Sequence, residues 1–166
     1  MAYHNRRSIR LQSYDYSSAG VYFITVCTWN RRCLLSSVIP GNKFVLADIQ
    51  LSVFGTIVRG AIEEAEKRTG FCVQSFVIMP NHIHLLLTIP VGNEVHRVGE
   101  FVGMFKSLSV HRWRAVCDQR GAQMGTVWQR NYYEHIIRNE QDYQEKLRYI
   151  TENPDAWYED ELYHEA

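Results

Sequence analysis

The chain has 166 residues, of which 46% are apolar and 22% charged, and its formal net charge at pH 7 is zero. This length and composition predict a single globular domain that spans residues 1–166. No apolar run reaches the ~20 residues of a membrane span, and residues 1–7 lack the apolar segment of a signal peptide. No CxxC motif occurs, which predicts reduced thiols in a cytoplasmic protein at Cys27, Cys33, Cys72 and Cys117.

The zero net charge hides an uneven distribution. Residues 149–166 contain six of the 18 acidic residues and no lysine or arginine, so all 18 basic residues precede position 149. The body of the chain is therefore basic and its end is acidic. A basic surface is typical of a nucleic-acid partner, although ordinary solvated charge gives the same pattern. An acidic tail that covers a basic face is a further hypothesis, which rests on charge alone.

The first half of the chain predicts an arm, a strand and a helix. Residues 1–19 are polar and read as an N-terminal arm, whereas the β-branched and aromatic run over 20–29 predicts a strand. Residues 30–46 are expected to form a connection. Apolar residues at three- and four-residue spacing then predict a helix over 48–68, with Asp48 as N-cap and Thr69-Gly70 at its end.

The second half predicts three further strands and two helices. The strands are expected over 71–79, 82–89 and 127–137, and the helices over 96–119 and 139–154. Pro80-Asn81 joins the first two of these strands as an antiparallel hairpin. Asn139 is the expected N-cap of the last helix, and Pro154 marks its end.

The order β-α-β-β-α-β predicts an α+β, ferredoxin-like split βαβ fold, in which two helices cover one face of a four-stranded antiparallel sheet. Residues 20–138 would form this core, 139–154 an added C-terminal helix, and 155–166 an acidic tail of uncertain structure. The other face of the sheet is expected to stay open for a site. The fold hosts many functions, so it decides none by itself.

His82 and His84 flank Ile83 inside a predicted strand. Side chains alternate along a strand, so both imidazoles point to one face and Ile83 points toward the core. A helix would separate the two histidines by about 200°. Two adjacent neutral imidazoles can bind a divalent metal ion, although strand histidines are often satisfied by their neighbours. The spacing therefore marks a candidate metal site.

The last predicted helix presents two different faces. Tyr143, Leu147 and Ile150 form an apolar stripe that should dock on the body of the protein. Tyr149 lies off this stripe, and Asn153 is one turn further along on the same side as Tyr149. The helix thus presents a phenol and a carboxamide together, although an ordinary surface tyrosine and a helix-ending asparagine would look the same.

In combination these motifs resemble the single-tyrosine HUH (His-hydrophobe-His) transposases, specifically the REP-associated tyrosine transposases of the transposase IS200-like group. The resemblance covers most of the chain. It is carried by Arg6-Arg7-Ser-Ile-Arg10, Tyr14-Asp-Tyr16, Gly20-Val-Tyr-Phe23, Val77-Ile-Met-Pro-Asn-His-Ile-His84, Trp128-Gln-Arg-Asn-Tyr-Tyr-Glu-His-Ile-Ile-Arg138 and Tyr149-Ile-Thr-Glu-Asn-Pro154.

The resemblance implies an enzyme that nicks and rejoins DNA. His82, His84 and Asn153 would hold Mg²⁺ or Mn²⁺; relatives often carry Gln at the position of Asn153. Tyr149 would be the nucleophile, leaving a 5′-phosphotyrosine and a free 3′-OH. The partner would be single-stranded or hairpin DNA of the repeated extragenic palindrome type, with no role for a membrane. The family admits a monomer or a homodimer.

Several roles stay open at this stage. Tyr132, Tyr133 and Tyr143 are alternative nucleophiles, and Glu134 and His135 could assist the metal or the DNA. A domesticated protein that binds palindromes with little cleavage, an RNA-recognition-like module and a small metal-dependent hydrolase are the alternative functions. The candidate DNA contacts are Arg6, Arg7, Arg10, Arg31, Arg32, Lys106, Arg112, Arg130 and Arg138.

Overall fold

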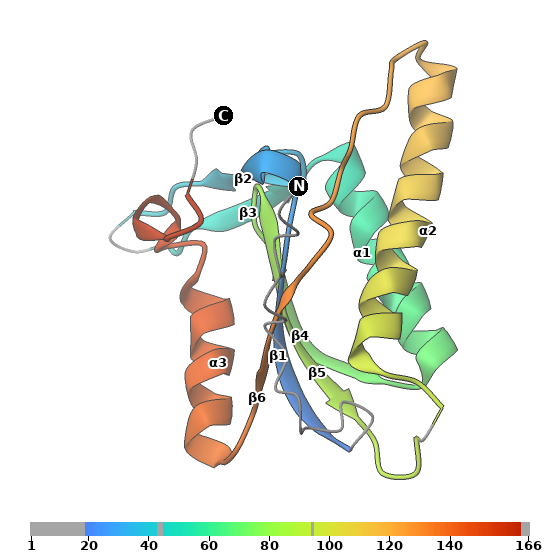
Figure 1. The fold of residues 1–166 in the computed structure, drawn as a ribbon. Helices are drawn as coiled ribbons and strands as arrows, with labels where there is room; N and C mark the ends of the chain where they lie inside the picture. Colours follow the sequence, from blue (N-terminus) through green and yellow to red (C-terminus); the bar gives the residue numbers. More distant parts are fainter. Residues whose placement is uncertain (1–18, 43–44, 94, 164–166) are drawn as a thin grey trace, which may run out of the picture.

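The computed structural model describes residues 19–42, 45–93 and 95–163. Its main sheet runs in the order β4-β5-β1-β6 with antiparallel neighbours, and its strands are β1 (Gly20–Cys27), β4 (Cys72–Ile78), β5 (His82–Ile89) and β6 (Tyr133–Ile136). The helices α1 (Val53–Thr69) and α2 (Val98–Gln119) lie on one side of this sheet, and α3 (Glu140–Glu152) lies on the other (Figure 1). The predicted ferredoxin-like fold with an added C-terminal helix is confirmed.

The main hydrophobic core lies between the sheet and the α1–α2 layer. Ile83, Leu85 and Leu87 of β5 are fully buried there, together with Ile24 of the neighbouring strand β1. These residues alternate with His82 and His84, as the strand periodicity predicts. The core therefore fixes the opposite face as the location of both imidazoles.

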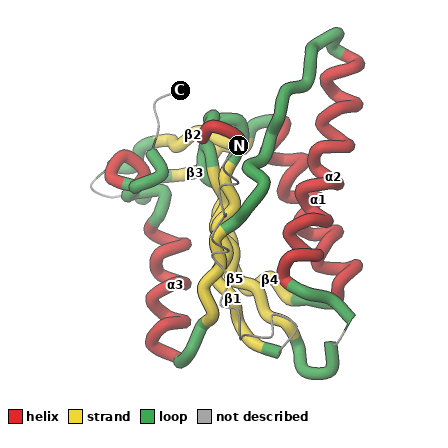
Figure 2. Tube along the Cα trace, viewed as in Figure 1, coloured by secondary structure: helices red, strands yellow, loops and turns green. Residues whose placement is uncertain are grey.

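The segment before α1 differs from the prediction. Residues 30–46 are predicted to form a connection, but they contain the strand β2 (Ser36–Ile39), and the short 3-10 helix η1 (Trp29–Arg31) begins one residue before them. This strand pairs with β3 (Asp48–Leu51) in a separate two-stranded sheet (Figure 2). Asp48 is therefore a strand residue, and Ser52 caps α1 by accepting a hydrogen bond from the Gly55 amide.

The fourth strand of the main sheet is shorter than predicted. Only Tyr133–Ile136 pairs regularly with β1, and an isolated bridge joins Trp128 to Thr28. Between them, Lys106 on α2 donates its ammonium to the carbonyl of Gln129 at 2.9 Å. A side chain of α2 thus occupies a backbone acceptor of the segment between Trp128 and Tyr133, a contact that the local sequence does not reveal.

The second face of the sheet is covered, contrary to the expectation that it stays open. Phe23 and Leu86 present apolar surface on this face, and Ile150 of α3 packs on them with Tyr143 and Leu147 at the edge of the cluster. The predicted docking stripe is confirmed, and burial of this apolar surface is the reason the helix lies here. Within the described ranges, no helix is both long and apolar enough to cross a membrane.

Candidate metal and nucleophile site

His82 and His84 lie side by side beneath α3 and the C-terminal segment. Their ring centroids are 4.5 Å apart, and both side chains are almost completely shielded from solvent. In the register of β5 with β1, His82 pairs with Cys27 and His84 pairs with Thr25. A pair of imidazoles buried in this way needs a polar partner for each ring nitrogen, because an unpaired buried nitrogen is costly.

The Nδ1 nitrogen of each imidazole contacts a neighbouring side chain. His82 Nδ1 lies 2.8 Å from Asn81 Oδ1, and Asn81 Nδ2 donates to the carbonyl of Leu162 at 2.8 Å. An amide oxygen only accepts, so His82 Nδ1 carries the proton and Nε2 keeps its lone pair. His84 Nδ1 lies 2.8 Å from Thr25 Oγ1, and in the tautomer in which the hydroxyl accepts from Nδ1, His84 Nε2 also keeps its lone pair. Such contacts are how proteins orient metal-ligating histidines.

Both histidines are neutral at physiological pH. Burial lowers the pKa of His82 to about 4, although the nearby Asp160 carboxylate opposes the shift. Burial, followed by the neighbouring His82, also lowers the pKa of His84 well below its ordinary value. A metal ligand must offer a lone pair, and desolvation keeps these nitrogens deprotonated.

The end of α3 brings a third donor atom to the two imidazoles. Asn153, the C-terminal cap of α3, is almost fully buried. Among the described residues, His82 Nε2, His84 Nε2 and Asn153 Oδ1 are buried atoms with no hydrogen-bond partner. Two nitrogens and one amide oxygen therefore lie inside the protein with free lone pairs, which is the donor set that a divalent cation would satisfy.

Tyr149 lies one turn before Asn153 and reaches the same place. Its ring meets His84 edge to face at 5.0 Å between centroids, and its hydroxyl donates to Asp160 Oδ2 at 3.5 Å. Burial and the Asp160 carboxylate raise the pKa of Tyr149. The phenol stands beside the candidate metal site while remaining half-exposed to solvent.

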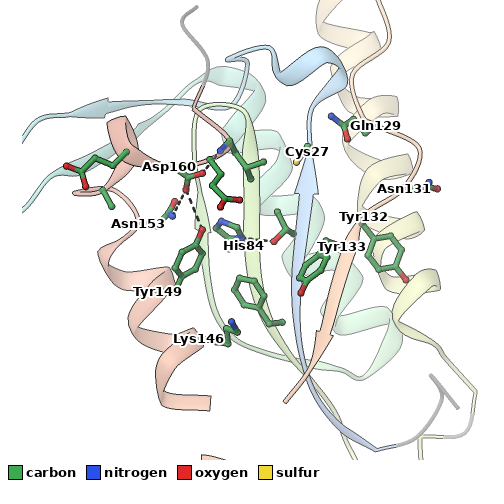
Figure 3. Close-up of a pocket in the computed structure, with 16 residues that line it drawn as sticks. Cys27, His84, Gln129, Asn131, Tyr132, Tyr133, Lys146, Tyr149, Asn153 and Asp160 are labelled. Carbon is green, nitrogen blue, oxygen red and sulfur yellow. Dashed lines mark hydrogen bonds between the residues drawn. The ribbon is translucent and has the colours of Figure 1, made fainter. Parts of the chain in front are cut away.

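A cavity of about 840 Å³ opens in front of these residues (Figure 3). Strand residues form one wall, and α3 and the C-terminal segment form the other. Its lining residues are Phe23, Thr25, Cys27, His84, Gln129, Asn131, Tyr132, Tyr133, Lys146, Tyr149, Asn153, Ala156, Glu159, Asp160, Glu161 and Leu162. The space is large enough for several groups of a ligand, and its aromatic walls suit flat rings.

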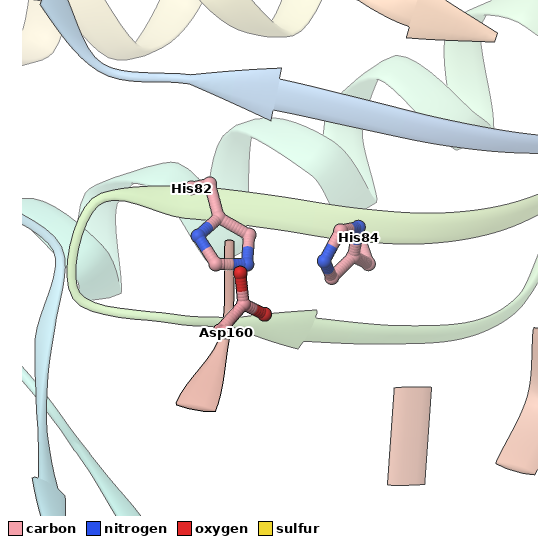
Figure 4. Close-up of side chains that lie close together, drawn as sticks. All are labelled: His82, His84 and Asp160. Atoms are coloured by element: carbon pink, nitrogen blue, oxygen red, sulfur yellow. The ribbon is translucent and has the colours of Figure 1, made fainter. Parts of the chain in front are cut away.

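Two residues of this site were missing from the sequence prediction. Asp160 belongs to the acidic tail, where no periodicity indicated structure, and its carboxylate lies within 4.8 Å of ligand nitrogens of His82 and His84 (Figure 4). Lys146 lies on α3 with its ammonium 5.4 Å from the Phe23 ring centroid. The one feature of the sequence that pointed to Lys146 is its position three residues before Tyr149.

The alternative nucleophiles differ in their surroundings. Tyr133 is half-exposed on β6, pairs with Thr25 in register and lines the cavity, as does Tyr132. Tyr143 packs instead in the small cluster under α3. Tyr149 differs from them in that its ring contacts His84, a residue of the candidate metal site.

Glu134 and His135 lie on opposite faces of β6. Glu134 is the cross-strand partner of Ile24 and therefore shares the face toward α1 and α2. His135 lies on the α3 face, where its Nε2 is 2.9 Å from the carboxylate oxygens of Asp142. This pair fastens β6 to the first turn of α3, and neither residue reaches the buried imidazoles.

The predicted DNA contacts are scattered over the molecule. Arg31 donates to the carbonyl of Glu161 at 3.0 Å, so it holds the tail near the site. Arg112 pairs with Glu64 and joins α2 to α1 on the opposite side of the sheet. Arg32, Arg130 and Arg138 are exposed, and Arg6, Arg7 and Arg10 lie outside the described residues. Their roles in DNA binding stay predictions.

Comparisons with known proteins agree with this geometry. The family model described as "Transposase IS200 like" matches residues 42–153, which is more than half of the chain. An uncharacterized protein of Haemophilus influenzae is 35% identical over 96% of this chain and 94% of its own. A REP-associated tyrosine transposase of Escherichia coli is 28% identical over 84% of this chain and 68% of its own.

A solved structure of a REP-associated tyrosine transposase bound to a REP hairpin has the same fold. It superposes with a TM-score of 0.65 at 25% identity, covering 89% of this chain and 72% of the other. The fold and the family model that match this chain are those of tyrosine transposases, which are DNA-cleaving enzymes. The chain belongs to the transposase IS200-like family.

Proposed function

We propose that this chain cleaves single-stranded DNA next to a hairpin, using a divalent metal ion and Tyr149 as nucleophile. The observation that carries the proposal is the convergence of three partnerless buried donor atoms, on His82, His84 and Asn153, beside the Tyr149 ring. Mg²⁺ or Mn²⁺ bound there would polarise the scissile phosphate and stabilise its developing charge.

The protein residues supply position and the nucleophile. The His82 and His84 nitrogens are held in place by Asn81 and Thr25 before any ligand binds, which reduces the reorganisation that binding requires. In the reaction the Tyr149 oxygen would form a bond to phosphorus while the bond from phosphorus to the 3′-oxygen breaks. The phenol loses its proton and the departing 3′-oxygen ends as a hydroxyl. A free phenol has a pKa of ~10, and burial and Asp160 raise the pKa of Tyr149 further, so the bound cation would have to favour the phenolate.

Reversal of the same step would rejoin the strand. The free 3′-hydroxyl attacks the phosphotyrosine, a new phosphodiester forms and Tyr149 is released. The covalent intermediate conserves the phosphodiester bond, so no external energy source is required. One metal centre and one phenol would therefore be sufficient for strand transfer.

The cavity supports a single-stranded DNA substrate. Tyr133 lines it and is half-exposed, and an exposed aromatic ring binds unpaired bases by stacking. Lys146 of α3 lies at the opposite wall, where its ammonium would bind a phosphate. By similarity to the relatives that carry the name, the adjoining duplex would be a hairpin of the repeated extragenic palindrome type.

The test is formation of a covalent protein–DNA adduct. The protein is incubated with Mn²⁺ and a hairpin oligonucleotide that carries a 5′ single-stranded extension, and a denaturing gel resolves the adduct. Tyr149→Phe should abolish the adduct and leave hairpin binding intact, whereas Tyr133→Phe, a matched change in the same cavity, should retain it. An adduct with Tyr149→Phe would refute the nucleophile assignment.

A second variant tests the metal. His82→Ala should lose the adduct through loss of metal binding, and retained metal-dependent cleavage would remove His82 from the ligand set. Hairpin binding by the wild type without an adduct in Mg²⁺ or Mn²⁺ would favour the alternative, a domesticated palindrome-binding protein.

A further inference from the structure

The C-terminal segment is fixed directly over the candidate metal site. Trp157 is buried with its ring 6.0 Å from the His82 ring, and Asn81 donates to the carbonyl of Leu162. Arg31 donates to the carbonyl of Glu161. These contacts lie on both sides of Asp160 in the sequence, and they therefore hold Asp160 at the cavity wall.

The Asp160 carboxylate contacts the residues of the proposed site. Asn153 Nδ2 donates to Asp160 Oδ2 at 2.9 Å, and the Leu162 amide donates to Oδ1 at 2.6 Å. A carboxylate oxygen and one nitrogen each of His82 and His84 lie within 4.8 Å of one another. This spacing is short enough for one cation to contact all three groups after small side-chain movements.

We propose that Asp160 is an additional metal ligand, supplied by the tail before DNA binds and displaced by the scissile phosphate. The inference rests on the proposed function, because it assumes a metal ion held by His82, His84 and Asn153. It adds a residue to that site and a competition between the tail and the substrate.

Charge explains why a fourth ligand is expected at this position. Two imidazoles and an amide are neutral, so a divalent cation bound to them alone would keep its full charge in a buried place. Burying uncompensated charge is expensive, and a carboxylate oxygen is also a ligand that Mg²⁺ and Mn²⁺ prefer. Asp160 offers one negative oxygen donor, and a DNA phosphate offers the same.

The tail occupies space that the substrate needs. Asp160 lines the same cavity as Tyr149, and the Tyr149 hydroxyl donates to its carboxylate. A phosphorus atom in reach of the Tyr149 oxygen requires the region that the carboxylate fills. The phosphate and Asp160 are therefore alternative occupants of one position, and binding of one should weaken binding of the other.

The experiment measures Mn²⁺ affinity of the full chain without DNA by isothermal titration calorimetry. Asp160→Asn keeps an acceptor for Asn153 and removes the charge, and we expect its Mn²⁺ affinity to fall at least about tenfold, since even contacts behind the ligands are worth that much. Glu161→Gln removes the same charge from the next residue, and we expect less than about a twofold change. Unfolding midpoints of both variants establish that the fold is retained.

A second measurement tests the displacement. At saturating Mn²⁺, Asp160→Asn should bind the single-stranded extension about tenfold or more tighter than the wild type, and it should still form the Tyr149 adduct. The same substitution thus weakens metal binding and strengthens DNA binding. A general effect of charge would instead appear in Glu161→Gln as well, which would overturn the assignment.

The outcomes separate this inference from the proposed function. Wild-type protein that binds no Mn²⁺ would refute the metal centre itself. Normal Mn²⁺ binding by both Asp160→Asn and the wild type would refute only the fourth ligand. Loss of the adduct in Asp160→Asn at saturating Mn²⁺ would refute displacement and place the carboxylate in the catalytic machinery.

Discussion

His84 and Thr25 are cross-strand partners on β5 and β1, and the threonine hydroxyl lies 2.8 Å from His84 Nδ1. The register of one strand pair therefore orients a ligand of the proposed metal site. Both residues are buried, and the hydroxyl is the polar group that the structure places against His84 Nδ1. The contact determines which way the imidazole turns its free nitrogen.

Thr25→Val should weaken Mn²⁺ binding about 10- to 100-fold, because it keeps the shape of the side chain and removes the hydroxyl that orients His84. Thr25→Ser keeps the hydroxyl and should bind Mn²⁺ almost normally. Calorimetric titration of the DNA-free protein gives both values. Equal affinities for the two variants would show that the Thr25 hydroxyl does not orient the ligand.

Ile150 should hold α3, and with it Tyr149 and Asn153, against the sheet. It is the one fully buried residue of α3, and Ile→Ala changes in cores cost about 2–5 kcal/mol. We expect Ile150→Ala to lower the free energy of unfolding by about that amount and to lose hydrogen-exchange protection first in α3. Glu145→Ala, on the exposed side of α3, should change stability by less than about 0.5 kcal/mol. Uniform loss of protection in Ile150→Ala would contradict a separately docked helix.

Lys146 should contact a phosphate of the single-stranded extension. We expect Lys146→Ala to weaken binding several-fold at low salt and to reduce the slope of log affinity against log salt by about 0.7, the value for one contact to a single strand. Lys67→Ala removes an exposed lysine from α1, across the sheet, and should leave the slope unchanged. Fluorescence anisotropy over a salt series measures both. An unaltered slope in Lys146→Ala would remove this lysine from the interface.

The lowered pKa of Lys106 predicts that the free energy of unfolding depends on pH in the alkaline range. Burial lowers the pKa of its ammonium to about 8 in the folded protein, against ~10.4 for an unfolded chain. Between these values the unfolded chain holds the proton and the folded protein has released it. The cost of burying the charge, present below pH 8, therefore disappears as the pH rises.

The wild type should accordingly gain stability relative to Lys106→Met between pH 7.5 and pH 10. With the partial exposure of the ammonium taken into account, we expect a gain of about 1–2 kcal/mol. Urea unfolding of both proteins under reducing conditions measures the difference. A wild-type advantage that stays constant or shrinks over this range would show that the Lys106 pKa is not lowered.

The course of the chain explains which predictions from sequence were wrong. Asp48 and Ser52 are both good helix caps, and the choice between them depended on the pairing of β3 with β2, a contact that local patterns do not contain. The strand expected over 127–137 is interrupted where Lys106, 23 residues earlier in the chain, donates to the Gln129 carbonyl. In both cases a tertiary contact outweighed a local preference.

Local periodicity determined much of this protein from sequence. Alternation along 82–89 placed both histidines on one face, and helical spacing placed Tyr149 and Asn153 on another side from the docking stripe. Strands and helices have periods of two and 3.6 residues, so a few neighbouring residues are enough to recognise each pattern. The tertiary structure alone decided that the second face is covered and that Asp160 lies at the histidines. The first fact depends on α3, whose Ile150 packs against Phe23 and Leu86. The second depends on contacts such as that of Asn81 with the Leu162 carbonyl, 81 residues later in the chain.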